Sequence, residues 1–197
     1  MKKIVEKKNY TQCGVLTSYI YTFIYVYKDS AMVYSSYIKN NEFHKKFYTI
    51  FEKIIQEEKI DFFNVFLGPA PLLSSRTTLI AMQAFFLAKK ISIVVTKGYE
   101  YYKHPDFQII IIQNFGGFYT LIENNVMQES LLLSDIESRQ FGNKNIALVS
   151  RENHEIKIGV SYSYLLFPFV KKIIQDGESK FRRGSIVKKA QEIIFFL

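Results

Sequence analysis

The chain has 197 residues, which is enough for one ordinary domain or for two small lobes that share a core. Its composition, 48% hydrophobic with 9 glycines and 4 prolines, excludes a disordered or collagen-like protein, and its single cysteine, Cys13, cannot form an internal disulfide. The net charge is +8. No apolar run reaches the roughly 20 residues of a membrane span, and no signal peptide is visible, so we expect a soluble, cytoplasmic protein.

The first part of the sequence changes from a strand-like to a helix-like pattern. Residues 14–27 and 31–38 are rich in β-branched and aromatic side chains, and a turn-like Lys28-Asp29-Ser30 separates them. This pattern predicts a meander of up to three strands. Between residues 43 and 59, apolar residues recur at three- and four-residue steps with lysines and glutamates between them, which predicts an amphipathic helix.

The next segment has the pattern of a βαβ unit. Residues 62–67 form an apolar run of strand length, and the two prolines that follow predict a loop, because proline lacks an amide donor. We expect Ser74 or Ser75 to cap a helix over residues 76–90, and residues 91–96 to form a second buried strand.

The second half alternates less regularly between strand-like and helix-like segments. We predict strands at residues 107–112, 118–123, 145–150 and 155–160, and helices at residues 162–175, interrupted near Pro168, and 185–196. No proline- or glycine-rich linker separates the two halves, so two lobes would be packed together. No internal repeat is visible.

The predicted helix over residues 76–90 is apolar around most of its circumference. A helical wheel gives one stripe of small side chains and an opposite stripe of large ones: Thr77, Ala81, Ala84 and Ala88, and Leu79, Met82 and Phe86. The polar residues form only a narrow line: Arg76, Gln83 and Lys90. A helix on the surface of a sheet needs one apolar face. This helix should therefore be covered on two sides, either within its own fold or by a second protein.

The motifs of catalytic and nucleotide-binding proteins are missing. The loop before this helix lies where α/β sheets bind anions, but its single glycine, Gly68, makes it a poor phosphate loop. His44, His104 and His154 are far apart and have no second ligand at metal spacing. No pair of carboxylates can be assigned to acid–base chemistry. These residues favour a binding protein without a metal or a cofactor over an enzyme.

The positive charge allows two interpretations. Most basic residues occur in short pairs spread along the chain, which is typical of a lysine-rich solvated surface. The segment with Lys180, Arg182 and Arg183 instead combines cations with an aromatic ring, and it could contact RNA phosphates and a base. The sequence leaves both interpretations open.

A resemblance to a known family is carried by the segment from Asp61 to Arg76, DFFNVFLGPAPLLSSR, and by LIAMQAFFLAKKISIVV after it. These residues resemble the bacterial TsaB (YeaZ) family of tRNA threonylcarbamoyladenosine biosynthesis proteins. That family has an apolar strand, the motif GPGSFTGLR, an alanine-rich helix and a further strand. Gly68, Pro69 and Arg76 match the motif in place, and Gly116-Gly117-Phe118-Tyr119 resembles the GEVY part of the family's DARRGEVY hairpin.

The resemblance implies an α/β protein with the actin-like ATPase fold, in which two ribonuclease-H-like lobes, residues 1–100 and 101–197, have mixed β-sheets and flanking helices. It implies a non-catalytic scaffold subunit for threonylcarbamoyladenosine modification of tRNA. Its partners would be a TsaD-type catalytic subunit and a TsaE-type ATPase, with tRNA contacted indirectly, and it would form a homodimer when alone. The implied partner interface consists of Leu79, Ala81, Met82, Ala84, Phe86 and Ala88.

Several positions depart from the family pattern. Leu16 stands where the first strand of the family has an aspartate, and Ala70, Pro71 and Ser74 occupy glycine or serine positions of the loop. The aspartate and arginines of the DAR segment are also missing. The resemblance therefore implies a diverged member that has lost a metal–nucleotide anchor. The alternative is a basic RNA-binding module without enzymatic activity, which would bind tRNA by itself and lose it steeply with salt.

Overall fold

Two five-stranded mixed sheets form the framework of the protein, and the computed structural model describes residues 9–68, 72–124, 126–151, 155–165, 168 and 170–187. The first sheet has the order β3-β2-β1-β4-β5, with β1 Gln12–Thr17, β2 Tyr21–Lys28, β3 Ala31–Lys39, β4 Phe62–Leu67 and β5 Ser92–Lys97. β1, β2 and β3 form an antiparallel meander, whereas β4 runs parallel to β1, and β5 runs parallel to β4.

The second sheet repeats this strand order. It runs β8-β7-β6-β9-β10, with β6 Ile109–Gln113, β7 Tyr119–Glu123, β8 Val126–Leu131, β9 Ile146–Val149 and β10 Ser163–Tyr164. Its first three strands are again an antiparallel meander, and its last two are again parallel additions. The two halves of the chain therefore share one topology, although no repeat is visible in the sequence.

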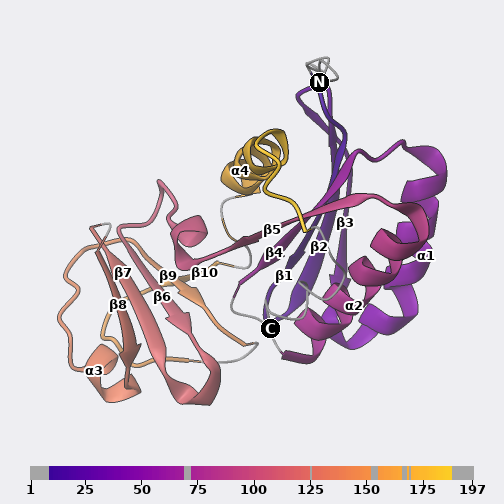
Figure 1. Ribbon diagram of the computed structural model, residues 1–197. Helices are drawn as coiled ribbons and strands as arrows, with labels where there is room; N and C mark the ends of the chain where they lie inside the picture. Colours follow the sequence, from indigo (N-terminus) through magenta and orange to yellow (C-terminus); the bar gives the residue numbers. More distant parts are fainter. Residues whose placement is uncertain are drawn as a thin grey trace.

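Helices α1 (Phe43–Glu57) and α2 (Leu72–Lys89) cover one face of the first sheet (Figure 1). The apolar residues of α1 recur at helical spacing, so one side of that helix is buried: Phe43, Phe47, Phe51 and Ile54. Alternate strand residues such as Cys13, Val15 and Phe63 point into the same core, because successive side chains of a strand face opposite sides of the sheet. A short helix, α3 (Leu133–Glu137), belongs to the second half.

The opposite face of the first sheet is covered by α4 (Val170–Arg182), and the second sheet lies beside the first lobe (Figure 1). Leu16 and Phe66 of the first sheet share one apolar core with Ile112 of the second sheet and Ile173 of α4. Helix α4 contacts β4 and β5, although its sequence follows that of the second sheet. The two lobes are thus packed together, and the C-terminal helix joins them.

Buried polar side chains fix the position of α4 on the sheet. The Gln12 side-chain amide donates to the carbonyl of Ile174 (3.1 Å), and the Asn64 amide donates to the carbonyl of Ile173 (2.9 Å). The helix comes close at Gly177, where a Cβ atom would lie 2.1 Å from Nδ2 of Asn64. Gly177 therefore allows an approach that a side chain would prevent.

Most of the elements predicted for the first half are confirmed. The meander contains three strands, the amphipathic helix is α1, and the strand over residues 62–67 is β4. Helix α2 begins at Leu72, so Ser74 and Ser75 lie inside it and do not cap it. The prediction of an N-cap there is therefore wrong.

The predictions for the last quarter are less accurate. Residues 155–160, which were predicted to form a strand, form none, although Ile156 and Ile158 are buried. Residues 163–164 form β10 where a helix was expected, and the helix starts only at Val170. Of the helix predicted over 185–196, residues 185–187 are not helical and the rest lies outside the described residues. No helix in the described part of the chain is both long and apolar enough for a bilayer span.

Candidate functional site

Helix α2 packs on the first sheet through one side only. Thr78, Leu79, Ala81 and Met82 are buried there, and the hydroxyl oxygens of Thr78 and of Thr17 in β1 lie 3.3 Å apart. These four residues lie on one side of the helix, because Leu79, Ala81 and Met82 follow Thr78 by one, three and four positions. The inner face of α2 is therefore part of the protein core.

The outer face of α2 is apolar and exposed. Ile80 and Leu87 are 61% and 52% exposed, and Ala84 and Ala88 are exposed beside them. Exposed Arg76 lies on the same face one turn before Ile80. Helix α2 contains no acidic residue, and it ends in a lysine. The result is an uncovered apolar helix face with positive charge near both of its ends, a kind of patch that marks interaction sites.

The structure divides the predicted interface residues between the two sides of α2. Leu79, Ala81 and Met82 are core residues, so in this structure they are not at the surface that a partner could contact. Phe86 is half-buried, whereas Ala84 and Ala88 are exposed as such an interface requires. The large stripe of the helical wheel therefore faces the protein's own sheet, and the small stripe is split between the core and the surface.

Sequence reasoning missed Ile80 and Leu87, which are the exposed large apolar side chains of α2 over residues 76–89. A signal for them was present, since both lie next to the narrow polar line of Arg76, Gln83 and Lys90 on the helical wheel. Apolar residues next to the polar side of a helix lie farthest from the side that packs on the protein core, so they are the least buried. The exposed face is thus centred on Ile80 and Leu87 and not on the alanines.

The loop before α2 contributes close packing at Gly68. A Cβ atom on Gly68 would lie 2.4 Å from Cε1 of Phe66 and 2.9 Å from the hydroxyl oxygen of Tyr102. This glycine therefore accommodates neighbouring aromatic rings. Of the other two matched motif residues, Pro69 lies outside the described residues, and Arg76 is exposed on α2.

Tyrosine side chains join the two lobes near the ends of β1 and β6. The Tyr19 hydroxyl donates to the backbone carbonyl of Gln113, which links the turn after β1 to the end of β6. The Tyr99 hydroxyl donates to Oδ1 of Asn114 (3.2 Å), and the Asn114 amide donates in turn to the Thr120 hydroxyl (2.9 Å). This chain of hydrogen bonds holds the two lobes in one relative orientation.

The chemistry beside this junction is apolar and phenolic. Leu16, where the TsaB resemblance places an aspartate, is fully buried in one core with Phe66 and Tyr102. Burial raises the pKa of the Tyr102 hydroxyl, which has no hydrogen-bond partner among the described residues. The described residues also contain no cluster of three or more His, Cys, Asp or Glu side chains that could hold a metal ion. The Leu16 side chain, unlike that of an aspartate, has no oxygen atom that could bind a metal ion.

Stability should depend on the protonation of Tyr19 at high pH. Burial raises the pKa of Tyr19 from 10.0 to about 12, although the charge of Arg151 acts in the opposite direction. Because the folded-state pKa is the higher one, the stabilisation by Tyr19 is complete below pH 10 and is lost as the pH rises through about 12. Urea denaturation should therefore show that wild type and Tyr19→Phe differ in their free energy of unfolding below pH 10, and that this difference decreases as the pH rises to about 12. A constant difference would contradict this role of the hydroxyl.

The basic residues that were predicted to contact RNA lie at the end of α4. Nζ of Lys180 donates to the carbonyl of Val95 in β5 (3.3 Å), and Nη2 of Arg182 lies 2.6 Å from a carboxylate oxygen of Glu178. Arg183 is exposed. Lys180 and Arg182 thus help to fix the end of α4, and RNA contact by this segment stays a prediction.

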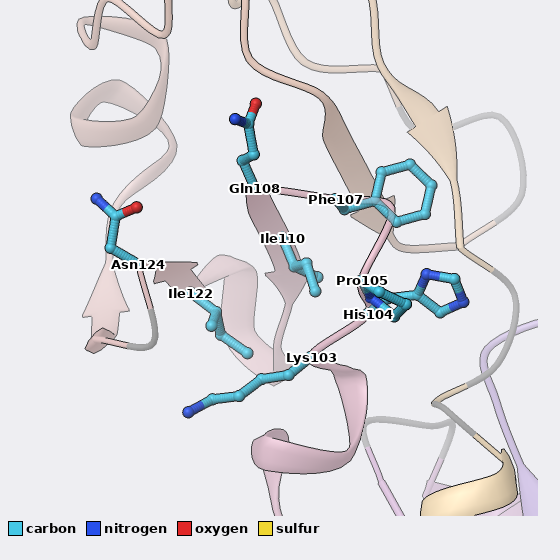
Figure 2. Close-up of a pocket in the computed structure, with 8 residues that line it drawn as sticks. All are labelled: Lys103, His104, Pro105, Phe107, Gln108, Ile110, Ile122 and Asn124. Atoms are coloured by element: carbon cyan, nitrogen blue, oxygen red, sulfur yellow. The ribbon is translucent and has the colours of Figure 1, made fainter.

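A separate hollow of about 350 Å³ lies on the second lobe (Figure 2). It is lined by Lys103, His104, Pro105, Phe107, Gln108, Ile110, Ile122 and Asn124. Figure 2 shows Lys103 and Asn124 extending to one side, and the rings of His104 and Phe107 lying on the other side. Nδ1 of His104 accepts a hydrogen bond from the Asp106 amide (3.3 Å). Because the polar groups diverge, they do not form a set of ligands around one point.

Two solved structures are similar to this chain over nearly its whole length. YeaZ from Pseudomonas aeruginosa has a TM-score of 0.61 and 13% sequence identity, covering 93% of this chain and 97% of that chain. An uncharacterized protein with similarity to peptidase YEAZ from Pseudomonas aeruginosa has a TM-score of 0.57 and 12% identity, covering 92% and 96%. No protein-family model and no curated protein matches the sequence. At these identities the likeness establishes the fold alone, and it fits the predicted α/β fold of the actin-like ATPase kind, with two mixed β-sheets and flanking helices.

Proposed function

We propose that this protein is a TsaB-type, non-catalytic subunit that binds a TsaD-type catalytic subunit and supports threonylcarbamoyladenosine modification of tRNA. The observation that carries the proposal is the exposed apolar face of α2, centred on Ile80 and Leu87. This face lies on a fold that is similar to YeaZ over 93% of the chain. The TsaB-like sequence pattern from Asp61 to Arg76 includes the start of the same helix.

The proposed contact is an apolar helix face with positive charge near its two ends. Covering Ile80 and Leu87 removes apolar area from water and contributes about 25 cal/mol for each Å² buried. Ala84 and Ala88 have small side chains, so a partner helix can come close at the centre of the face. Arg76 at one end favours a partner that presents carboxylates at the edge of its own apolar surface.

In this proposal the chain supplies a binding surface and the partners supply the chemistry. Leu16 and the aromatic packing around Gly68 support this division, because they place apolar and phenolic groups where the family pattern has an aspartate and a glycine-rich loop. The TsaD-type subunit would transfer the threonylcarbamoyl group to tRNA, with a TsaE-type ATPase as a further component. The first sheet beneath α2 gives the contact face a rigid support, since the inner side of the helix is core.

Ala84→Arg should weaken the complex with the TsaD-type subunit of the same organism by about a hundredfold or more, because burying an unpaired guanidinium costs several kcal/mol. The monomer should remain folded, since Ala84 is exposed. Light scattering on a sizing column measures the complex, and circular dichroism checks the fold. The matched control is Gln175→Arg, which adds the same charge at an exposed position of α4.

Several outcomes would contradict the proposal. The first is a wild-type protein that forms no complex with the TsaD-type subunit, and another is an Ala84→Arg variant that binds as well as the Gln175→Arg control. A reconstituted modification assay provides a second readout, in which omission of this protein should reduce the yield of modified tRNA. Direct binding of tRNA by the isolated protein, weakening steeply with salt, would favour the RNA-binding alternative.

A further inference from the structure

After α4 the chain crosses from one face of the first sheet to the other. Ile173 and Ile174 of α4 belong to the apolar core that contains Leu16. Val187, five residues after the end of α4, is 5% exposed and belongs to the other core, beneath α1 and α2. Its amide donates to the carbonyl of Ile93 in β5 (2.8 Å). Because β5 is an end strand of the sheet, the chain has passed around this edge to the side that α2 covers.

The sequence that follows Val187 is apolar at helical spacing. Residues 188–197, which lie outside the described residues, have the sequence KKAQEIIFFL. Six of these ten residues are apolar, so the segment needs an apolar surface to cover it. Four of the six recur at steps of three and four: Ala190, Ile193, Ile194 and Leu197. This spacing predicts a helix with one apolar stripe.

The exposed face of α2 has the pattern and the length to receive this segment. Ile80, Ala84 and Leu87 are exposed and recur at steps of four and three. A helix rises about 10 Å from Ile80 to Leu87, and a helix of ten residues spans about 15 Å. Ile93 follows the last residue of α2 by four positions, so the bonded Val187 lies near that end. A segment that starts there can run back along the whole exposed face.

The charges of the segment suit this direction. A helix that runs from Val187 back along α2 is antiparallel to α2, so opposite ends of the two helix dipoles meet. Lys188 and Lys189 then lie near the end of α2 whose last carbonyls carry partial negative charge. Helix α2 has no acidic residue, so Glu192 of the segment supplies a partner for Lys89.

We propose that residues 188–197 dock on the exposed face of α2, over Ile80, Ala84 and Leu87, and must leave before another protein binds there. The link through Val187 makes the contact intramolecular, and a short tether gives an effective concentration in the millimolar range. The segment is therefore a built-in competitor that lowers the affinity of this face for its partner. That the displaced partner is a TsaD-type subunit rests on the proposed function, whereas the docking itself does not.

Alkylation of a cysteine on this face tests the docking without any partner. Ala84→Cys should react with a maleimide about tenfold faster in a chain shortened to end at Val187 than in the full chain, if the segment is docked in about nine of ten molecules. Cys13 is fully buried and should not interfere. Thr49→Cys, at an exposed position of α1, is the matched control and should react equally in both chains.

A substitution in the full chain gives the same test without shortening it. Ile194→Glu places a charge in the apolar stripe, so the cysteine of Ala84→Cys should react as fast as in the shortened chain. Gln191→Glu adds the same charge outside the stripe and should keep the protection. Circular dichroism checks that each variant is folded.

The affinity for the TsaD-type subunit should rise by the same factor as the alkylation rate. An apparent Kd is the intrinsic Kd divided by the fraction of molecules whose face is open, and alkylation depends on the same fraction. The shortened chain and Ile194→Glu should therefore each bind this subunit about tenfold more tightly than wild type.

Equal alkylation of Ala84→Cys in the full and the shortened chain would overturn the proposal. Protection that Ile194→Glu leaves intact would do the same. If the face is protected and the shortened chain still forms no complex with the TsaD-type subunit, the docking stands and the proposed function fails. If the complex forms and the face is never protected, the opposite conclusion holds.

Discussion

Gly14→Ala should lower the free energy of unfolding by about 3 to 5 kcal/mol, through overpacking combined with the loss of buried hydrogen bonds. Gly14 lies directly opposite Tyr25 in the β1–β2 pair. The ring of Tyr25 lies against the glycine so closely that a Cβ atom there would be 1.9 Å from Cζ. The ring has nowhere to move, because Tyr25 is fully buried and its hydroxyl donates to Oε1 of Gln12.

Chemical denaturation measures this loss, and Cys13 provides an independent readout. The thiol is fully buried, and burial raises its pKa, so alkylation of the folded protein should be slow. Faster alkylation of Gly14→Ala would report the increased population of open states. A double-mutant cycle with Tyr25→Leu tests the cause, since Gly14→Ala should cost much less once the ring is gone. An equal cost in both backgrounds would show that the clash with Tyr25 is not responsible.

Gly177→Ala should also destabilise the protein, by about 2 to 4 kcal/mol. Helix propensity alone predicts the opposite sign, because alanine is favoured over glycine inside a helix by about 1 kcal/mol. The new methyl group would lie 2.1 Å from Nδ2 and 2.6 Å from Cγ of Asn64. Asn64 would then have to give up its hydrogen bond to Ile173, and α4 would have to lift from the sheet.

The sign of the effect can be reversed by changing the neighbour. In an Asn64→Ala background the clash is absent, and Gly177→Ala should then be neutral or stabilising, as at an ordinary helix position. Thermal denaturation of the four proteins in this cycle gives the coupling between the two positions. If Gly177→Ala stabilises the wild-type protein, the close packing of α4 on Asn64 does not hold.

Elements with strong local patterns could be predicted from the sequence. β4 was located correctly because residues 62–67 are apolar and are bounded by Asp61 and Gly68. The period of residues 43–59 likewise identified α1. Residues 155–160 show the limit of this reasoning. Ile156 and Ile158 are buried, but burial does not require pairing, and the strand predicted over residues 155–160 is absent.

The candidate site was only partly predictable, because tertiary packing decides which side of an apolar helix is buried. The sequence indicated that α2 needs cover on two sides, and it did not rank Ile80 and Leu87 above Leu79 and Met82 as surface residues. The tyrosine junction was not foreseen either. Tyr19 and Gln113 are 94 positions apart, and no local pattern links a turn in one lobe to the end of a strand in the other.

The long sequence separation between α4 and the sheet that it covers has a consequence for protein synthesis. Gln12 bonds to a carbonyl 162 residues later, so a nascent chain carries an uncovered sheet face until those further residues have left the ribosome. Contacts of such long sequence separation slow folding and leave intermediates open to aggregation. A C-terminal truncation before Val170 should therefore be more damaging than its length suggests, since it removes the helix that completes the N-terminal lobe.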